Sequence, residues 1–382
     1  MQHNAHNPAF RFVQEPETFN RFTEKSLLQY CLGATLYMPG TRQVVDKLIG
    51  RAFPALKSMV MCFEDAIGAE EVTAAEDNVL AHLSMLKAAL DEGQLHDDDI
   101  PLIFLRVRDT EQFARFAERI NRQQADVLSG FVFPKFCSAN ADKYLAELTR
   151  LNDRLDRPLF GMPILESAAI AYRETRTAEL IALREILRQH PDRILNIRVG
   201  GTDFSAFFGV RRGLNASIYD ILPVRDVLAD ILNVFNRTED GYTVSGPVWE
   251  YFLAYKQDDI HKLLDQHIHK ALGAGQVILN DAIDGLLREV LLDKANGFVG
   301  KTVIHPSHIR FVNALQAATR EEFEDACQIL GKDGGVCKSS ANNKMNEMNP
   351  HRNWATRVIL RARAYGVIKH EGEYMQLLLG EG

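Results

Sequence analysis

Apolar residues along the chain gather in short runs that are separated by longer amphipathic segments. The intervening segments, such as AEDNVLAHLSMLKAALDEG and TAELIALREILRQH, have the apolar spacing of helices. Strand-like runs that alternate with helical segments predict βαβ units and a parallel sheet. The runs are LGATLYMP (32–39), SMVMCFED (58–65), PLIFLRVR (101–108), GFVFPKF (130–136), LFGMPILE (159–166), ILNIRVGG (194–201), YTVSGPVW (242–249) and GFVGKTVIHP (297–306).

The number of these runs favours a closed (β/α)₈ TIM barrel in the α/β class. Six of them are nearly continuous in apolar residues, as expected of strands that are covered on both faces. A length of 382 residues fits one barrel with additions. An open doubly wound sheet is the alternative. The segment QVILN (276–280) competes with YTVSGPVW for the position of the seventh strand.

The two ends of the chain differ from the barrel pattern. We expect an N-terminal extension over residues 1–30, the barrel over 31–320, and a C-terminal linker and helical lid or oligomerisation element over 321–382. The stretch 331–350 is rich in Gly, Ser and Asn, which predicts a long loop. A basic segment with helical periodicity follows it at 351–367.

Composition and charge exclude several classes of protein. Hydrophobic residues make up 46% and charged residues 25% of the chain, which is ordinary for a packed globular protein. The formal charge of −7 argues against a nucleic-acid partner, which would need a basic surface. No run approaches the roughly 20 apolar residues of a membrane span, and the first residues lack the apolar core of a signal peptide. Five cysteines without a CxxC pair favour a reduced, cytoplasmic protein.

Polar residues recur where the predicted strands end. In an α/β barrel the carboxyl ends of the strands carry the active site, so these positions are the candidate site. The residues are Glu64, Asp65, Arg106, Arg108, Lys135, Glu166, Gly200, Gly201, Thr202, Asp203 and His305.

Glu166 and Asp203 are the candidate metal ligands. They are separated by 37 residues, about one βα unit, which predicts that they end adjacent strands. Two carboxylates with open positions beside them suit Mg²⁺, with Mn²⁺ as the alternative. Zinc is disfavoured because the His and Cys residues lack its usual spacings. Gly200 and Gly201 would let the backbone approach a ligand closely.

Two arginines are candidate substrate ligands. Arg106 and Arg108 lie two residues apart on a predicted strand, so we expect their side chains on the same face. A guanidinium in the barrel mouth would bind a carboxylate, and arginine can do so with two parallel hydrogen bonds. An external salt bridge is the alternative role.

Seven short motifs, in chain order, resemble those of the citrate lyase beta subunit, malyl-CoA lyase and HpcH/HpaI-type aldolase family. The chain looks closest to the divergent C–C bond lyases that are associated with tellurium-resistance gene clusters. The motifs are LYMPG (36–40), FEDAI (63–67), RVR (106–108), FPK (133–135), ILES (164–167), GGTDFSAFFG (200–209) and GFVGKTVIHPSHI (297–309).

This resemblance implies a (β/α)₈ barrel with Mg²⁺ held by Glu166 and Asp203 and with Arg106 binding substrate. Family members cleave or form a C–C bond beside a carbonyl, usually on an acyl thioester, and are usually trimers or hexamers. Their C-terminal lid reaches a neighbouring subunit and carries an acid in the motif G-K-M-x-D. Glu347, in the segment 343–347, resembles that acid.

The chain departs from the family pattern at three positions. Cys62 stands where the motif D-x-E-D has its first acid, Arg108 replaces an Asn, and Ser245 stands where an Asp is usual. These departures leave open the particular substrate and whether it is carried as a CoA thioester.

The sequence therefore predicts a Mg²⁺-dependent C–C bond lyase or aldolase for a small 2-oxo or 2-hydroxy carboxylate. Arg106 would offset negative charge that develops on the substrate, and Glu64 or Glu347 would move a proton. We expect Arg108, Lys135, Gly200, Gly201 and Thr202 to contribute to substrate binding. The alternatives are another Mg²⁺-dependent enolate reaction, such as thioester hydrolysis or a phosphoenolpyruvate-type transfer, and a degenerate barrel that acts as a binding subunit.

Overall fold

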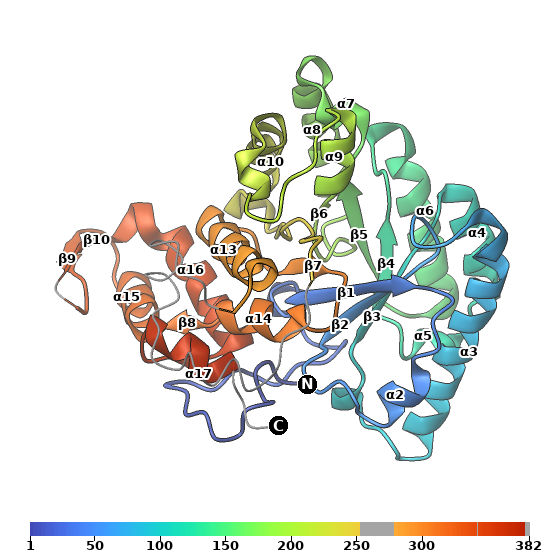
Figure 1. Cartoon of the computed structure of the whole chain (residues 1–382), viewed down its shortest axis with the longest axis horizontal. Coiled ribbons are helices and arrows are strands. Elements are labelled where there is room, and N and C mark those ends of the chain that lie inside the picture. Colours follow the sequence, from blue (N-terminus) through green and yellow to red (C-terminus); the bar gives the residue numbers. More distant parts are fainter. Residues whose placement is uncertain (253–278, 342, 379–382) are drawn as a thin grey trace.

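The predicted strands form one parallel sheet whose order follows the chain. The computed structural model describes residues 1–252, 279–341 and 343–378. Seven strands lie in the order β6-β5-β4-β3-β2-β1-β7 (Figure 1). They are β1 (Ala34–Pro39), β2 (Ser58–Cys62), β3 (Leu102–Arg106), β4 (Gly130–Phe133), β5 (Phe160–Leu165), β6 (Arg198–Val199) and β7 (Lys301–Val303).

The segment predicted as the seventh strand closes this sheet into a barrel. Val244 forms a parallel bridge with Ile197, next to β6, and Gly246 forms one with Lys301 in β7. The two edges of the sheet are thereby joined, which confirms the (β/α)₈ architecture over an open sheet. Of the competing segment, residues 276–278 lie outside the described residues.

Helices follow the strands and cover the outside of the barrel. Their starts obey local rules: at α4, the Asp109 carboxylate accepts hydrogen bonds from the N–H groups of Glu111 and Gln112. Helices in the barrel part are α2 (Val45–Ile49), α3 (Val72–Asp91), α4 (Thr110–Arg119), α5 (Arg122–Ala125), α6 (Ser138–Leu155), α7 (Ala168–Ala171), α8 (Arg173–Arg188), α9 (Gly201–Phe207), α10 (Leu222–Phe235), α13 (Asp281–Asn296) and α14 (His308–Leu315).

The C-terminal region is more ordered than the sequence predicts. The stretch 331–350, predicted as a long loop, contains an antiparallel hairpin of β9 (Val336–Lys338) and β10 (Met345–Glu347). It connects two helices that pack against each other, α15 (Arg320–Leu330) and α16 (Met348–Tyr365). Gly and Asn signal the turn between short strands, and this signal is indistinguishable from that of a loop.

The N-terminal segment packs against the C-terminal region beside the barrel (Figure 1). The Val13 N–H donates to the Val367 carbonyl at 2.7 Å, and the Glu17 N–H donates to the Arg363 carbonyl at 2.6 Å. The remaining elements here are α1 (Lys25–Leu28), β8 (Ala318–Thr319), β11 (Val367–Ile368) and α17 (Tyr374–Leu378). Among the described residues, no helix has the length and apolar character needed to span a membrane.

Candidate active site

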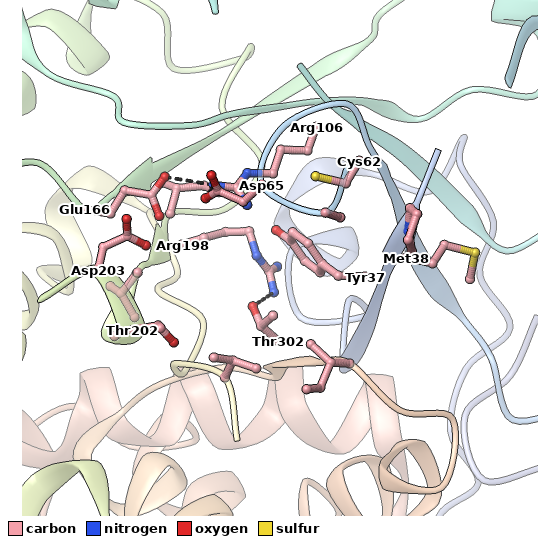
Figure 2. A pocket seen from close by; sticks show the side chains of 18 residues that line it. Tyr37, Met38, Cys62, Asp65, Arg106, Glu166, Arg198, Thr202, Asp203 and Thr302 are labelled. Carbon is pink, nitrogen blue, oxygen red and sulfur yellow. Dashed lines mark hydrogen bonds and ion pairs between the residues drawn. The ribbon is translucent and has the colours of Figure 1, made fainter. Parts of the chain in front are cut away.

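The carboxyl ends of the barrel strands surround a pocket of about 430 Å³. Its lining comes from elements that are far apart in sequence, from the end of β1 to the residues at β7 (Figure 2). Charged side chains in the lining are Asp65, Arg106, Glu166, Arg198 and Asp203. The barrel thus brings the predicted metal ligands and Arg106 into one cavity.

Arg106, the last residue of β3, is the centre of a cluster of carboxylates. Its Nη2 atom lies 2.6 Å from Glu64 Oε2, 3.1 Å from Glu166 Oε1 and 3.4 Å from Asp65 Oδ2. Burial favours the neutral form of Arg106, but the charges of Glu166 and Glu64 outweigh it and raise its pKa. Arg106 therefore remains a cation held rigidly at the pocket wall.

Lys135 orients Glu166 through its backbone. Its φ of 47° lies in the left-handed region, which is uncommon for a residue with a side chain. In this conformation the Lys135 N–H donates to Glu166 Oε1 at 2.9 Å. The Lys135 ammonium forms an ion pair with Glu64. One oxygen of Glu166 is thus fixed by Lys135 and Arg106 together.

The other oxygen of Glu166 and the Asp203 carboxylate remain open. Among the described residues, none donates a hydrogen bond to Glu166 Oε2 or to Asp203. Burial raises the pKa of Glu166, Arg106 lowers it, and the nearby Asp203 charge raises it, to about 7 overall. Gly200 makes room for this arrangement, because a Cβ there would lie 2.4 Å from Glu166 Oε2.

The open carboxylate oxygens of Glu166 and Asp203 fit a divalent cation such as Mg²⁺. Glu166 Oε2 and the Asp203 carboxylate have no hydrogen-bond donor among the described residues, and nearby carboxylates repel each other unless a cation lies between them. The described part of the chain holds no cluster of three or more His, Cys, Asp or Glu residues placed to bind a metal. Two carboxylates with open oxygens, as Glu166 and Asp203 provide, are a ligand set that Mg²⁺ commonly uses while it keeps several waters.

Some of the other predicted site residues line the pocket, and others do not. Gly200, Gly201 and Thr202 line the pocket. Glu64 and Lys135 support it through their ion pairs with the lining residues. Arg108 and Glu347, the other two predicted residues, lie outside the pocket.

Arg108 and Glu347 do not line the pocket. The strand β3 ends at Arg106, so the two-residue alternation that was expected to align Arg108 with it no longer applies. The Arg108 side chain instead donates to the Phe63 carbonyl at 3.4 Å. Glu347 is exposed at the end of β10, on the C-terminal hairpin.

Sequence reasoning missed the most deeply buried charge in the pocket. Arg198 lies in β6 and reaches across to Thr302 and the Tyr37 ring (Figure 2). The signal was present in ILNIRVGG, where Asn196 and Arg198 interrupt an apolar run at a two-residue spacing. Both are buried, as inward-facing positions of a barrel strand should be.

Two departures from the family motifs have different consequences. The Ser245 hydroxyl lies within hydrogen-bonding distance of Asn196 Oδ1 and of the Val299 carbonyl, at 2.8 and 2.9 Å. Ser245 is buried, and its role is to join neighbouring strands. Cys62, in contrast, lines the pocket and puts a thiol where the family motif has an acid.

Comparison with known proteins found similar folds among solved structures. No curated protein matches the sequence. Protein CitE from Mycobacterium tuberculosis, in complex with magnesium, acetoacetate and coenzyme A, has a similar structure, with 18% identity, a TM-score of 0.51, and coverage of 86% of this chain and 97% of that one. RipC from Yersinia pestis has 17% identity, a TM-score of 0.45, and coverage of 75% and 95%. The malate synthase of Haloferax volcanii has 14% identity, a TM-score of 0.48, and coverage of 73% and 72%.

A family model covers most of the sequence. The model described as C–C bond lyase of the TIM-barrel fold matches residues 26–367. That span includes every strand of the barrel and all the charged residues of the pocket lining. The chain therefore belongs to the C–C bond lyase family of TIM-barrel proteins.

Proposed function

We propose that this protein is a Mg²⁺-dependent C–C bond lyase or aldolase that acts on a 2-oxo or 2-hydroxy carboxylate. The observation that carries the proposal is the pair of open carboxylates, Glu166 and Asp203, beside the fixed guanidinium of Arg106. The fold similarity to CitE, whose complex contains magnesium and acetoacetate, supports the same chemistry.

Each residue then has a role in the reaction. Glu166 and Asp203 would hold the ion, which supplies Lewis-acid polarisation of a substrate oxygen. Arg106 binds the substrate carboxylate and stabilises negative charge that develops as the C–C bond breaks. Lys135 keeps Glu166 in place through its N–H. Glu64 supports the pocket through ion pairs with Arg106 and Lys135, and it is the residue of this chain that we assign to proton transfer.

Metal and substrate binding test the proposal directly. We expect calorimetry to detect Mg²⁺ binding in the presence of pyruvate or oxaloacetate, with Mn²⁺ as a substitute. Glu166→Gln and Asp203→Asn should each weaken it at least tenfold, because each removes a charged ligand. Glu324→Gln, which changes an exposed carboxylate of α15, is the matched control. Unchanged affinity in both site variants would exclude this metal site. Repeating the titration with an acyl-CoA shows whether a thioester is used.

We further propose that the hairpin β9–β10 completes the site of a neighbouring copy in a trimer or hexamer. Glu347 lies outside its own chain's pocket, and the hairpin exposes the apolar side chains of Val336 and Met345. Mixed oligomers of Glu166→Gln and Glu347→Gln subunits should then regain part of the activity that each variant lacks. Full activity of Glu347→Gln alone would remove this residue from the mechanism.

The proposal also places the protein in the cytoplasm. The five cysteines are free thiols in the structure, and Cys31 and Cys62 are buried. Such cysteines are typical of a reducing compartment.

A further inference from the structure

The Arg198 side chain extends from β6 through the interior of the barrel toward β7 and β1. Its Nη2 donates to the Thr302 hydroxyl at 2.7 Å, and its Nη1 lies 3.4 Å from the Thr35 hydroxyl. The guanidinium carbon lies 5.4 Å from the centre of the Tyr37 ring. Thr35 and Thr302 are register partners on β1 and β7, so Arg198 links β6 to these two neighbouring strands. Its partners are thus two neutral hydroxyls and a ring.

This guanidinium has no carboxylate partner, unlike the other buried arginines. Four arginines of the described chain are buried. Arg106 pairs with Glu64 and Glu166, Arg176 with Asp230, and Arg212 with Glu289. Among the described residues, no carboxylate lies within 4.0 Å of Arg198.

An unneutralised buried cation is costly unless an anion binds beside it. Burial strips water from the charge, and hydroxyl dipoles replace that water only in part. Arg198 is 1% exposed, yet it lines the pocket that holds Arg106 and the open carboxylates. Figure 2 shows its guanidinium between Tyr37 and Thr302, apart from the ion pairs of Arg106 and Glu166. The pocket therefore contains two guanidinium groups, of which one is neutralised by the protein.

We propose that Arg198 binds a second anionic group of the substrate. The inference rests on the proposed function, in which Arg106 and the metal bind the 2-oxo or 2-hydroxy carboxylate end. The substrate class is then a 2-oxo or 2-hydroxy acid with a carboxylate or a phosphate at its other end. Arginine recognises either group through parallel hydrogen bonds. Tyr37 and Thr302 hold the Arg198 side chain in position for that contact.

The test compares ligands of the same shape that differ in this one charge. In malate the fourth carbon is the carbon of a carboxylate, whereas in 2-hydroxy-4-methylpentanoate the fourth carbon bears two methyl groups. With Mg²⁺ present, calorimetry of the full-length protein should give at least tenfold tighter binding for malate. Arg198→Gln should weaken malate binding ten- to a hundredfold, because a charged hydrogen bond is lost. It should change binding of the methyl analogue less than threefold, and Arg198→Lys should restore part of the malate affinity.

Further measurements separate this role from a structural one and from the proposed function itself. The melting temperature of Arg198→Gln should stay within about 2 °C of wild type, since no carboxylate loses its partner. Equal weakening of both ligands, or no preference for malate in the wild type, overturns the inference. In the same titrations Glu166→Gln should lose both ligands, and unchanged binding there overturns the proposed function instead. If neither acid binds the wild type, both proposals fall. Tighter binding of 3-phosphoglycerate than of malate identifies the second group as a phosphate, and the reverse identifies a carboxylate.

Discussion

Two clusters of buried charge in this barrel differ in whether each charged group has a partner of opposite charge. In the first, which we call the α13 network, Lys301 bonds Glu289 and Asp293 at 2.9 and 2.6 Å. Arg212 bonds both oxygens of Glu289, and the Tyr219 hydroxyl donates to Asp293 Oδ1 at 2.5 Å. Every carboxylate oxygen of this network therefore has a donor.

The pocket is built from the same residue types but leaves positions open. Glu166 Oε2 and the Asp203 carboxylate lack donors among the described residues, and Arg198 lacks an anion. A closed network contributes to the fold alone, because nothing is left for a ligand to bind. In an open cluster, charged groups without partners remain available to bind a ligand. Both clusters are buried, so the pairing of their charges, and not their burial, distinguishes the binding site from the structural network.

Breaking the closed network should have the largest effect. Lys301→Met leaves Asp293 Oδ2 without a donor and Glu289 with fewer partners, so the free energy of unfolding should fall by about 3–5 kcal/mol. Urea denaturation measures this loss. Adding Asp293→Asn should recover part of it, since the orphaned charge is removed.

An exposed ion pair serves as the control for the loss of the buried one. Arg150 pairs with Glu118 and Glu147, and its side chain is 45% exposed. Arg150→Met should therefore cost less than about 1 kcal/mol. Similar losses in the two variants would contradict the distinction between closed buried networks and surface pairs.

A second closed contact joins the barrel to the C-terminal region and should give a pH dependence. Burial acts to raise the pKa of Glu322, but Lys294, Arg361 and the Thr319 N–H outweigh it and lower the pKa to about 2. A lowered pKa stabilises the fold above the ordinary value of 4.5, and this contribution is lost as the pH falls toward 2. The loss is at most about 3 kcal/mol.

Unfolding experiments between pH 7 and pH 2 test this contribution. The difference in stability between wild type and Glu322→Gln should shrink as the pH falls below 4.5, because the protonated Glu322 no longer differs in charge from Gln. A constant difference over this range would show that the charge of Glu322 adds nothing to the contact.

The smallest predicted effect is a loss of Mg²⁺ affinity when Gly200, beside the open carboxylates, is replaced. Gly200→Ala places a methyl group against Glu166 Cβ and Oε2, both 2.4 Å from the ideal position, so Glu166 must move. Mg²⁺ affinity should fall about 10- to 100-fold, in the range seen when groups that orient a ligand are changed. Gly213→Ala is the matched control, because a Cβ there has no neighbour within 4 Å. Equal affinities in the two variants would show that the position of Glu166 does not matter.

The sequence predicted the barrel and much of the site because both follow from local patterns. Continuous apolar runs marked the strands, and Glu166 and Asp203 stand at strand ends that adjacent βα units bring together. The prediction that Arg108 shares a face with Arg106 was wrong because β3 ends at Arg106. Strand ends depend on tertiary hydrogen bonds, which a sequence pattern does not show.

Arg198 and the hairpin β9–β10 were missed for different reasons. A single arginine in an apolar strand is ambiguous until the partners across the barrel, Thr35 and Thr302, are known. The hairpin has three-residue strands, which are too short to show a clear alternation of apolar and polar residues.

The contact between the two ends of the chain has a consequence for synthesis on the ribosome. The Tyr365 hydroxyl donates to the carbonyl of Tyr30, 335 residues earlier. At 5–20 residues per second, roughly 20 to 70 s pass between the translation of these two residues. Throughout that time His3, which is buried and stacked on Tyr365 in the finished fold, lacks this partner. The segment that contains His3 and Tyr30 can therefore complete its packing only after α16 has been translated.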